Sequence, residues 1–224
     1  MIDLLHKYVH FPTGMLFGDP HFRTFDGRSY TFNGLGEYVL VDAMNGDFVI
    51  QIRTAVASSD SALMGTSIAA VAAQQVGGDP IQLEFNERFG VSVYISGTRV
   101  SFLEEQEQDF GSFSVCHQLN GTANVTFTNG VVLSATGSNE ILDVILTIPN
   151  TFNNHTKGLL GTWNGNPDDD FLTSSGTTLS PNSTEEELFH GFGQTCELRN
   201  VSHMCNTFNT FPIVVHFYIY KYMK

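Results

Sequence analysis

The stretch Gly18-Asp-Pro-His-Phe-Arg-Thr-Phe-Asp-Gly-Arg-Ser-Tyr-Thr-Phe-Asn-Gly-Leu-Gly-Glu-Tyr38 is the most informative part of this chain. Two turn signals, Asp26-Gly27 and Asn33-Gly34, bracket a short aromatic strand from Tyr30 to Phe32. Ahead of them, Asp19-Pro20-His21 forms a rigid X-Pro joint between a carboxylate and an imidazole. The stretch therefore predicts a short strand held between turns, preceded by a chemically distinctive dipeptide.

A second stretch lies far along the chain: Gly158-Leu-Leu-Gly-Thr-Trp-Asn-Gly-Asn-Pro-Asp-Asp-Asp-Phe171. Together the two stretches resemble the opening and closing signatures of von Willebrand factor type D domains. The opening signature reads Gly-Asp-Pro-His, then Thr-Phe-Asp-Gly, then Tyr-x-Phe-x-Gly. The resemblance covers roughly residues 12–199 and implies a β-rich extracellular module.

Short strands punctuated by Gly and Asn recur through the chain, in the spacing typical of a sandwich of two antiparallel sheets. We therefore expect an all-β fold. The segment from Ser61 to Val76 is ambiguous, because its alanines favour a helix by propensity, whereas the resemblance implies a strand; we expect the strand. Glu104 to Asp109 reads as an acidic loop or the tip of a hairpin. A short helix is expected from Ser183 to His190, near the C-terminal end, with Ser183 and Glu186 at capping-box spacing.

Three regions are expected: a tether at 1–17, the domain at 18–199 and a tail at 200–224. The first residues lack a basic head followed by an apolar run, so we do not expect them to be a signal peptide. An extracellular chain of this kind is then expected to be a fragment or an incomplete gene model. The tail reads as a last strand, a membrane-proximal segment or non-native sequence from a mispredicted exon, and the last reading is favoured.

Acidic residues outnumber basic ones by 23 to 10, which gives a formal net charge of −13. This charge argues against nucleic acid or an anionic membrane as a partner. Both cation binding and simple solubility are consistent with it.

Cysteine usage and glycosylation signals bear on the compartment. The chain has three cysteines, Cys116, Cys196 and Cys205, which allow at most one internal bridge at a time. It also has five Asn-x-Ser/Thr sequons, whose number favours secretion; they begin at Asn120, Asn124, Asn154, Asn182 and Asn200.

The acidic loop Asn164-Gly-Asn-Pro-Asp-Asp-Asp170 is a candidate calcium site. Ca²⁺ takes six to eight oxygen ligands, and three adjacent aspartates repel one another without a counter-ion. The loop itself contains no cation to relieve them. The loop is not an EF-hand, because Asp169 stands where that motif needs Gly and Ser175 where it needs Glu. An ordinary solvated turn is the competing interpretation.

The resemblance adds a ligand set. Carried over by position, Asp19, Asn164, Asp169 and Asp170 would supply side-chain oxygens. Asn166 would add its backbone carbonyl. One departure affects this site: Thr162 stands where many calcium-binding members have Asn. Trp163, the only tryptophan, is expected to anchor the loop by packing.

The bond between Asp19 and Pro20 is a candidate for self-cleavage. The aspartate carboxyl can attack its own carbonyl carbon to form a cyclic anhydride, and protonation makes the proline nitrogen a better leaving group. His21 is placed to deliver that proton. Relatives with the Gly-Asp-Pro-His motif include some that cleave here and stay associated, while others do not cleave. A plain structural turn is therefore the alternative.

The resemblance points to a cysteine-poor branch, as in large membrane mucins and sushi-domain-containing proteins. Gly36 and Leu160 stand where the family usually has cysteines. The expected function is a non-enzymatic, calcium-stabilised adhesive module at the cell surface or outside the cell. Its expected partners are other domains of its parent and extracellular proteins. A module of a lipid-carrying secreted protein is one alternative. A hydrolase using His21 is another, although no nucleophile motif or phosphate loop is present.

Overall fold

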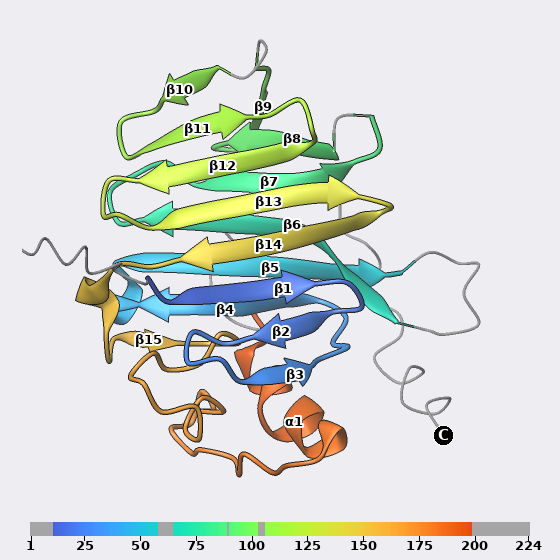
Figure 1. Ribbon diagram of the computed structural model, residues 1–224, viewed down its shortest axis with the longest axis vertical. Coiled ribbons are helices and arrows are strands. Elements are labelled where there is room, and N and C mark those ends of the chain that lie inside the picture. Colours follow the sequence, from blue (N-terminus) through green and yellow to red (C-terminus); the bar gives the residue numbers. More distant parts are fainter. Residues whose placement is uncertain (1–10, 58–64, 89, 103–105, 199–224) are drawn as a thin grey trace, which may run out of the picture.

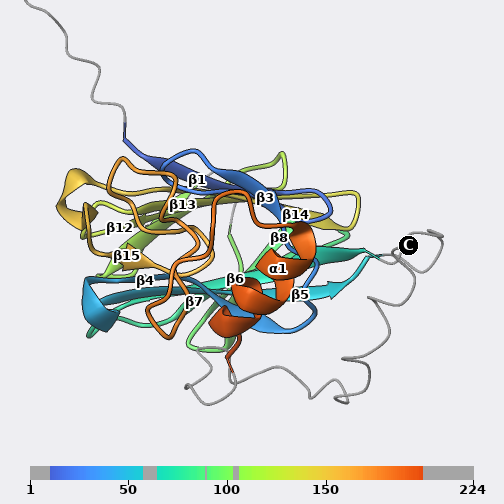
Figure 2. The same cartoon turned by 90° about the horizontal axis from the view of Figure 1, so that it is seen from below.

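The computed structural model describes residues 11–57, 65–88, 90–102 and 106–198. Two antiparallel sheets pack face to face (Figure 1), and the view from below shows them as two layers (Figure 2). The predicted β-sandwich is confirmed, with one short helix near the C-terminal end of the described chain. No helix in the described ranges is long and apolar enough to cross a bilayer.

The first sheet has eight strands in the order β10-β11-β12-β13-β14-β1-β2-β3. Their bounds are Glu107–Asp109 for β10, Phe113–His117 for β11, Thr122–Phe127 for β12, Val132–Ser138 for β13, Ile141–Thr147 for β14, Thr13–Phe17 for β1, His21–Arg23 for β2 and Ser29–Thr31 for β3.

The second sheet has seven strands in the order β15-β4-β5-β6-β7-β8-β9. Their bounds are Thr156–Lys157 for β15, Glu37–Ala43 for β4, Phe48–Val56 for β5, Thr66–Gln75 for β6, Ile81–Asn86 for β7, Gly90–Ile95 for β8 and Thr98–Val100 for β9. Three 3₁₀ turns, Met44–Gly46, Asn150–Phe152 and Gly193–Cys196, join the strands and follow the helix.

Two segments refine the sequence prediction, and a third resolves an ambiguity in it. Residues 13–17, assigned above to a tether, form β1 in the interior of the first sheet, between β14 and β2. Within the segment expected to be an acidic loop or a hairpin tip, Glu107–Asp109 pair with β11 as the edge strand β10, so this part belongs to a hairpin. Thr66–Gln75 is a strand, as the resemblance implied, because pairing with both β5 and β7 outweighs the helix propensity of its alanines.

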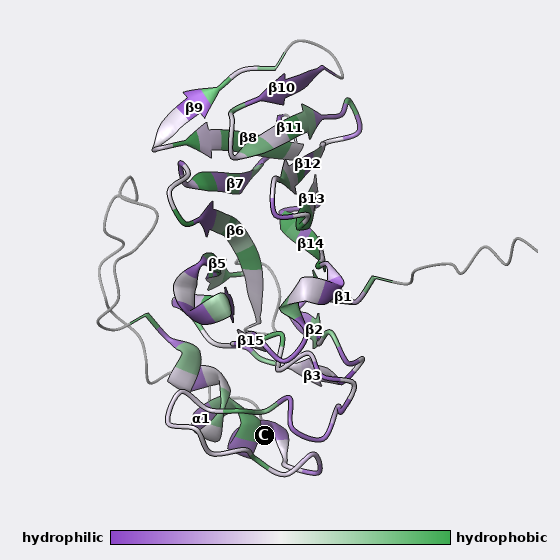
Figure 3. Ribbon diagram, turned by 90° about the vertical axis from the view of Figure 1, so that its left-hand side faces the viewer, coloured by the Kyte–Doolittle hydropathy of each residue, from purple (hydrophilic) through white to green (hydrophobic). Residues whose placement is uncertain are grey.

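Hydrophobic side chains from both sheets form one core, and Figure 3 shows the sheets edge-on with hydrophobic residues on strands of both. At one end of this core the two signature stretches meet. The Tyr30 hydroxyl donates to the Leu159 carbonyl at 2.6 Å, and the Tyr30 ring stands edge-on to Phe171. The opening and closing signatures are therefore packed as one unit, although they lie far apart in sequence.

The N-cap of helix α1 (Glu185–Gly191) lies one residue later than the sequence suggested. Thr184 is the N-cap and its side chain accepts from the Glu187 N–H, while the Glu187 side chain accepts from the Thr184 N–H. The capping box is thus Thr184–Glu187 rather than Ser183–Glu186. Adjacent hydroxyl and carboxylate residues made both registers compatible with the motif.

Glycine backbones bring the two sheets into contact at one point, and this gives a stability prediction. A Cβ on Gly137 of β13 would lie 1.8 Å from the carbonyl oxygen of Gly90 in β8. Gly137→Ala should therefore lower the free energy of unfolding by about 3 kcal/mol, because the backbone must move. Chemical denaturation measures this. Ser134→Ala, on the same strand, is the control; equal stability of both variants would contradict the prediction.

Candidate functional site

The acidic loop is anchored by a residue of the opening signature, Asp26. The backbone N–H groups of Asn164, Gly165 and Asn166 each donate to the same Asp26 oxygen, Oδ2, at 3.0 Å. Asp26 lies in the turn between β2 and β3, where Gly27 has a φ of 90°. The turn thus fixes the start of the loop through three hydrogen bonds to one carboxylate.

The loop side chains are also joined to one another and to the same turn. The amide nitrogens of Asn164 and Asn166 donate to Asp169 Oδ2 at 2.9 and 3.1 Å. Asp170 is fully buried, and its Oδ2 accepts from the Thr24 hydroxyl at 2.6 Å. The structure therefore brings together four of the predicted ligand residues: Asn164, Asn166, Asp169 and Asp170.

A cation from outside the loop relieves part of the charge repulsion expected there. Arg28, in the β2–β3 turn, pairs with Asp168 at 2.5 Å and donates from Nε to the Pro167 carbonyl at 3.1 Å. The loop itself contains no cation, as its sequence says, but the fold supplies one. This ion pair neutralises Asp168, whereas no salt bridge to Asp169 or Asp170 forms within the part of the chain that the structure describes.

Three oxygens at the loop fit a bound cation. Within the described ranges, Thr162 Oγ1, Asp169 Oδ1 and Asp170 Oδ1 are buried without a hydrogen-bond partner. Unpartnered buried oxygens are costly, and a hard cation such as Ca²⁺ would satisfy them. No three His, Cys, Asp or Glu side chains in the described chain converge into a metal site by themselves. Calcium here would therefore also need neutral oxygens, such as those of Thr162 and the asparagines.

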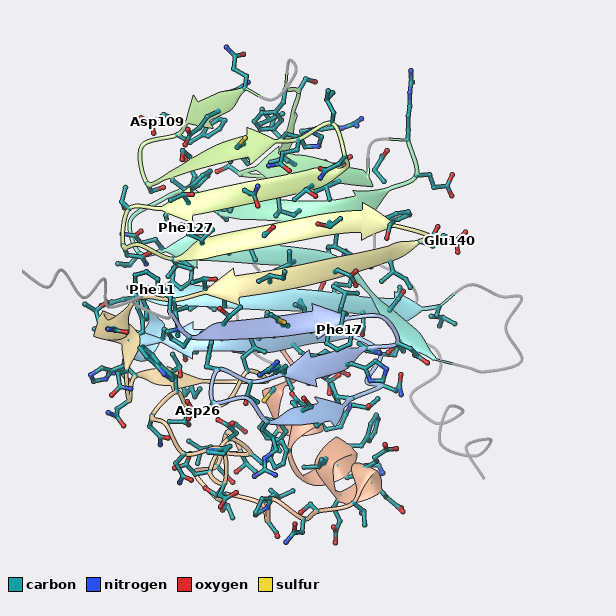
Figure 4. All side chains as sticks on the ribbon, in the orientation of Figure 1. Phe11, Phe17, Asp26, Asp109, Phe127 and Glu140 are labelled. Carbon is teal, nitrogen blue, oxygen red and sulfur yellow. The ribbon has the colours of Figure 1, made fainter. Side chains whose placement is uncertain are left out.

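Asp19 does not join this loop, which corrects the ligand set expected from the resemblance. Asp19 lies in the β1–β2 turn, and its carboxylate lies against Gly65. Asp19 precedes strand β2 and Asp26 follows it, so the two carboxylates lie at opposite ends of that strand. Figure 4 labels Asp26 and, next to the β1–β2 turn, Phe17. In the sequence, Asp26-Gly27 is recognisable as a turn signal, which does not reveal that the Asp26 carboxylate binds the acidic loop. The sequence feature that could have identified Asp26 is its position as the acidic residue of Thr24-Phe-Asp-Gly27, within the opening signature.

The pKa of Asp170 predicts how the stability of the domain depends on pH when a chelator keeps calcium away. Burial raises the pKa of Asp170 to about 7; the Thr24 hydrogen bond opposes this, and the charges of Asp26 and Asp169 add to it. From about pH 4 to 7 the folded state then binds a proton that the unfolded state has lost. The free energy of unfolding in chelator should therefore fall as pH rises through this window.

Denaturation of the full chain in chelator at several pH values measures this dependence. Asp170→Asn should remove the Asp170 contribution, whereas Asp168→Asn, at an exposed position, should retain it. An unchanged slope in Asp170→Asn would contradict the assignment. Calcium should also bind more weakly below pH 7, because the proton competes for the Asp170 carboxylate.

The Gly-Asp-Pro-His segment forms the turn between β1 and β2. Gly18 has a φ of 63°, in the left-handed region that favours glycine, and its N–H donates to Asp143 Oδ1 at 3.2 Å. Pro20 is buried, while Asp19 and His21 are exposed. The scissile bond proposed from the sequence thus lies in a tight, solvent-accessible turn.

The other residues named from the sequence, which are the tryptophan, the two positions where the family usually has cysteines and the sequons, lie at different places in the fold. The Trp163 side chain packs against the core, and the Trp163 backbone N–H donates to the buried Thr156 hydroxyl at 2.7 Å. Leu160 is fully buried in the core, and Gly36 has a φ of 147°. Asn120, Asn154 and Asn182 are exposed and Asn124 is half-buried on β12, while Asn200 lies outside the described residues.

Within the described chain no disulfide forms. Cys116 on β11 and Cys196 in the last 3₁₀ turn are both free thiols, and Cys205 lies outside the described residues. Burial raises the pKa of the Cys196 thiol to about 12, with a Thr195 hydrogen bond opposing it. The Cys196 thiol is therefore protonated at neutral pH, and a thiol is a poor nucleophile.

Comparison with known proteins agrees with this structure. The family model of the von Willebrand factor type D domain matches residues 14–177. The chain is 34% identical over 208 residues to human Sushi domain-containing protein 2, covering 92% of this chain and 25% of that protein. It is 37% identical over 195 residues to human Mucin-4, covering 82% of this chain and 4% of that protein. Bovine von Willebrand factor is 26% identical over 186 residues, covering 83% of this chain and 18% of that protein.

The chain thus spans a quarter or less of each of these larger proteins. Its two signatures pack together as one unit, and the family model covers strands of both β-sheets and the whole of the acidic loop. The chain belongs to the von Willebrand factor type D domain family.

Proposed function

We propose that this domain is a non-enzymatic structural module of an extracellular, adhesive or mucin-like protein. Its relatives named above include a mucin and von Willebrand factor, in which it would correspond to one part among others. Its partners would be other domains of its parent and extracellular proteins. The exposed sequons at Asn120, Asn154 and Asn182 would carry glycans in that setting.

The module is stabilised by calcium bound at the acidic loop. The observation that carries this proposal is the set of buried oxygens without partners, on Thr162, Asp169 and Asp170. Asp26 and the oxygens of Asn164 and Asn166 complete the donor set. When bound, the ion would neutralise the carboxylates and join the β2–β3 turn to the loop. Asp19 is not part of this site.

The second activity we propose is self-cleavage between Asp19 and Pro20. One oxygen of the Asp19 carboxylate attacks the backbone carbonyl carbon of the same residue. A C–O bond forms, the C–N bond to Pro20 breaks, and the proline nitrogen takes a proton from His21. One water then opens the cyclic anhydride, which leaves two carboxyl groups on Asp19 and a free amine on Pro20.

The calcium proposal is tested by thermal unfolding of the full chain with calcium and with chelator. A ligand that binds only the folded state stabilises it by about 2.7 kcal/mol at a concentration 100 times its Kd. A higher unfolding temperature in calcium, absent with magnesium at the same concentration, supports the proposal. Identical unfolding in calcium and chelator would refute it.

The cleavage proposal is tested by intact mass after mild acid. The chain carries its own control, because a second Gly-Asp-Pro occurs at Gly78-Asp79-Pro80 and lacks the histidine. There the Asp79 carboxylate accepts from the Ser96 hydroxyl at 2.7 Å. Fragments 1–19 and 20–224, without cleavage after Asp79, support a site-specific reaction. An uncleaved mass, or equal cleavage at both bonds, would reject it.

A further inference from the structure

Three elements outside the β1–β2 turn hold the Gly-Asp-Pro-His segment in place. Asp143 of β14 accepts from the Gly18 N–H, as described above. Thr31 of β3 contacts His21, and Gly65, directly before β6, contacts Asp19. Each of the two side chains that the cleavage uses therefore has a separate contact, His21 from the adjacent strand and Asp19 from the residue that precedes β6.

The His21 ring has a defined orientation. Its Nδ1 lies 3.1 Å from the Thr31 hydroxyl, on the neighbouring strand. Its Cδ2, on the other side of the ring, lies 3.7 Å from the position that a Cβ on Gly18 would take. The Phe17 ring lies 5.6 Å away, between ring centroids. With Nδ1 directed at Thr31, the Cδ2–Nε2 edge faces the turn that contains the Asp19–Pro20 bond.

Gly65 leaves room for the Asp19 carboxylate. A Cβ at position 65 would lie 2.1 Å from Asp19 Oδ1, 2.7 Å from its Cγ and 2.8 Å from its Oδ2. All three distances are far inside van der Waals contact, so any side chain at this position would displace the carboxylate. The backbone of Gly65 therefore forms one wall against which the Asp19 side chain rests.

We infer that Thr31 and Gly65 are positioning residues for cleavage of the Asp19–Pro20 bond, an inference that rests on the self-cleavage proposed above. The Thr31 hydroxyl accepts a hydrogen bond from Nδ1–H of His21 and so keeps Nε2–H directed at the turn. That proton passes to the Pro20 nitrogen as its bond to the Asp19 carbonyl carbon breaks. Gly65 keeps the attacking carboxylate of Asp19 in place as the C–O bond forms.

The experiment follows the rate of cleavage of the full chain in mild acid by intact mass. Thr31→Val keeps the size and β-branching but removes the hydroxyl, and should slow cleavage about tenfold or more. Thr31→Ser keeps the hydroxyl and should restore most of the wild-type rate. Ser29→Val places the same side chain on the same strand, two residues away, and should leave the rate unchanged.

Gly65→Ala tests the other contact and should slow cleavage about a hundredfold, because small displacements of a reacting group are costly. Thermal unfolding of each variant checks that it folds, and the Thr31 variants test the inference even if Gly65→Ala does not fold. Wild-type rates in Thr31→Val and in folded Gly65→Ala would overturn the inference while the cleavage proposal stands. Equal slowing in Thr31→Val and Thr31→Ser would overturn the role of the hydroxyl. A wild-type chain that never cleaves would overturn both proposals.

Discussion

Asp26→Ala is expected to remove the calcium-dependent stabilisation of this domain and to lower its stability in chelator as well. The substitution deletes the acceptor of three loop N–H groups, those of Asn164, Gly165 and Asn166. Hydrogen bonds to charged groups contribute about 1.5–3 kcal/mol each, so the loss in chelator should be about 3 kcal/mol or more. Thermal unfolding of the full chain, with and without calcium, measures both effects.

The matched control is Asp19→Ala, because the resemblance assigned the same calcium role to Asp19. Asp19 is exposed in a separate turn, so its removal should leave the response to calcium unchanged while abolishing cleavage. Asp26→Ala, if it folds, should lose the response to calcium and keep the cleavage. Loss of the calcium response in Asp19→Ala would contradict the separation of the two sites.

The second large effect concerns the fragments that cleavage would produce. We expect residues 1–19 to remain bound to residues 20–224 under native conditions. Strand β1 lies between β14 and β2, and the side chain of Leu16 is buried in the core. Breaking the bond after Asp19 leaves all of these contacts in place. The two fragments should therefore elute together in size-exclusion chromatography and separate only in denaturant.

Leu16→Ala should release the fragment 1–19 under native conditions. Truncating a buried leucine costs about 2–5 kcal/mol, and in the cleaved chain this cost weakens the binding of residues 1–19 to residues 20–224. Met15→Ala is the control on the same strand, since Met15 is on the opposite face and only half-buried. Native separation of the wild-type fragments would contradict the assignment of β1 as their link. Retention of the fragment in Leu16→Ala would contradict the role of the core contact.

Much of this fold follows from local sequence signals. The alternating apolar residues predict the strands, and the two signatures identify the family because they lie in the right order. Where intrinsic propensity and the observed element disagree, the cause is a contact distant in sequence. Thr66–Gln75 forms a strand because both of its neighbours pair with it, a tertiary effect that alanine propensity does not report.

The site was predicted less completely, because its geometry depends on contacts distant in sequence. The acidic loop itself supplied Asn164, Asp169 and Asp170, which lie together as expected. Asp19 and Asp26 both belong to the opening signature, and β2 runs between them, so only the folded hairpin shows which of them reaches the loop. Thr31 and Gly65 could not be found from sequence, since their contacts arise from strand pairing and close approach of the backbone.

The central claim, a cation bound at the acidic loop through Asp26, can be tested most directly with terbium, a luminescent substitute for calcium. Trp163 is the only tryptophan of the chain and lies between Thr162 and Asn164. Excitation of Trp163 should therefore sensitise emission from one bound terbium ion per chain. Calcium should displace it, and the emission should be lost in Asp26→Ala but retained in Asp19→Ala. Absence of sensitised emission in the wild-type chain, or the same emission in Asp26→Ala, would contradict the claim.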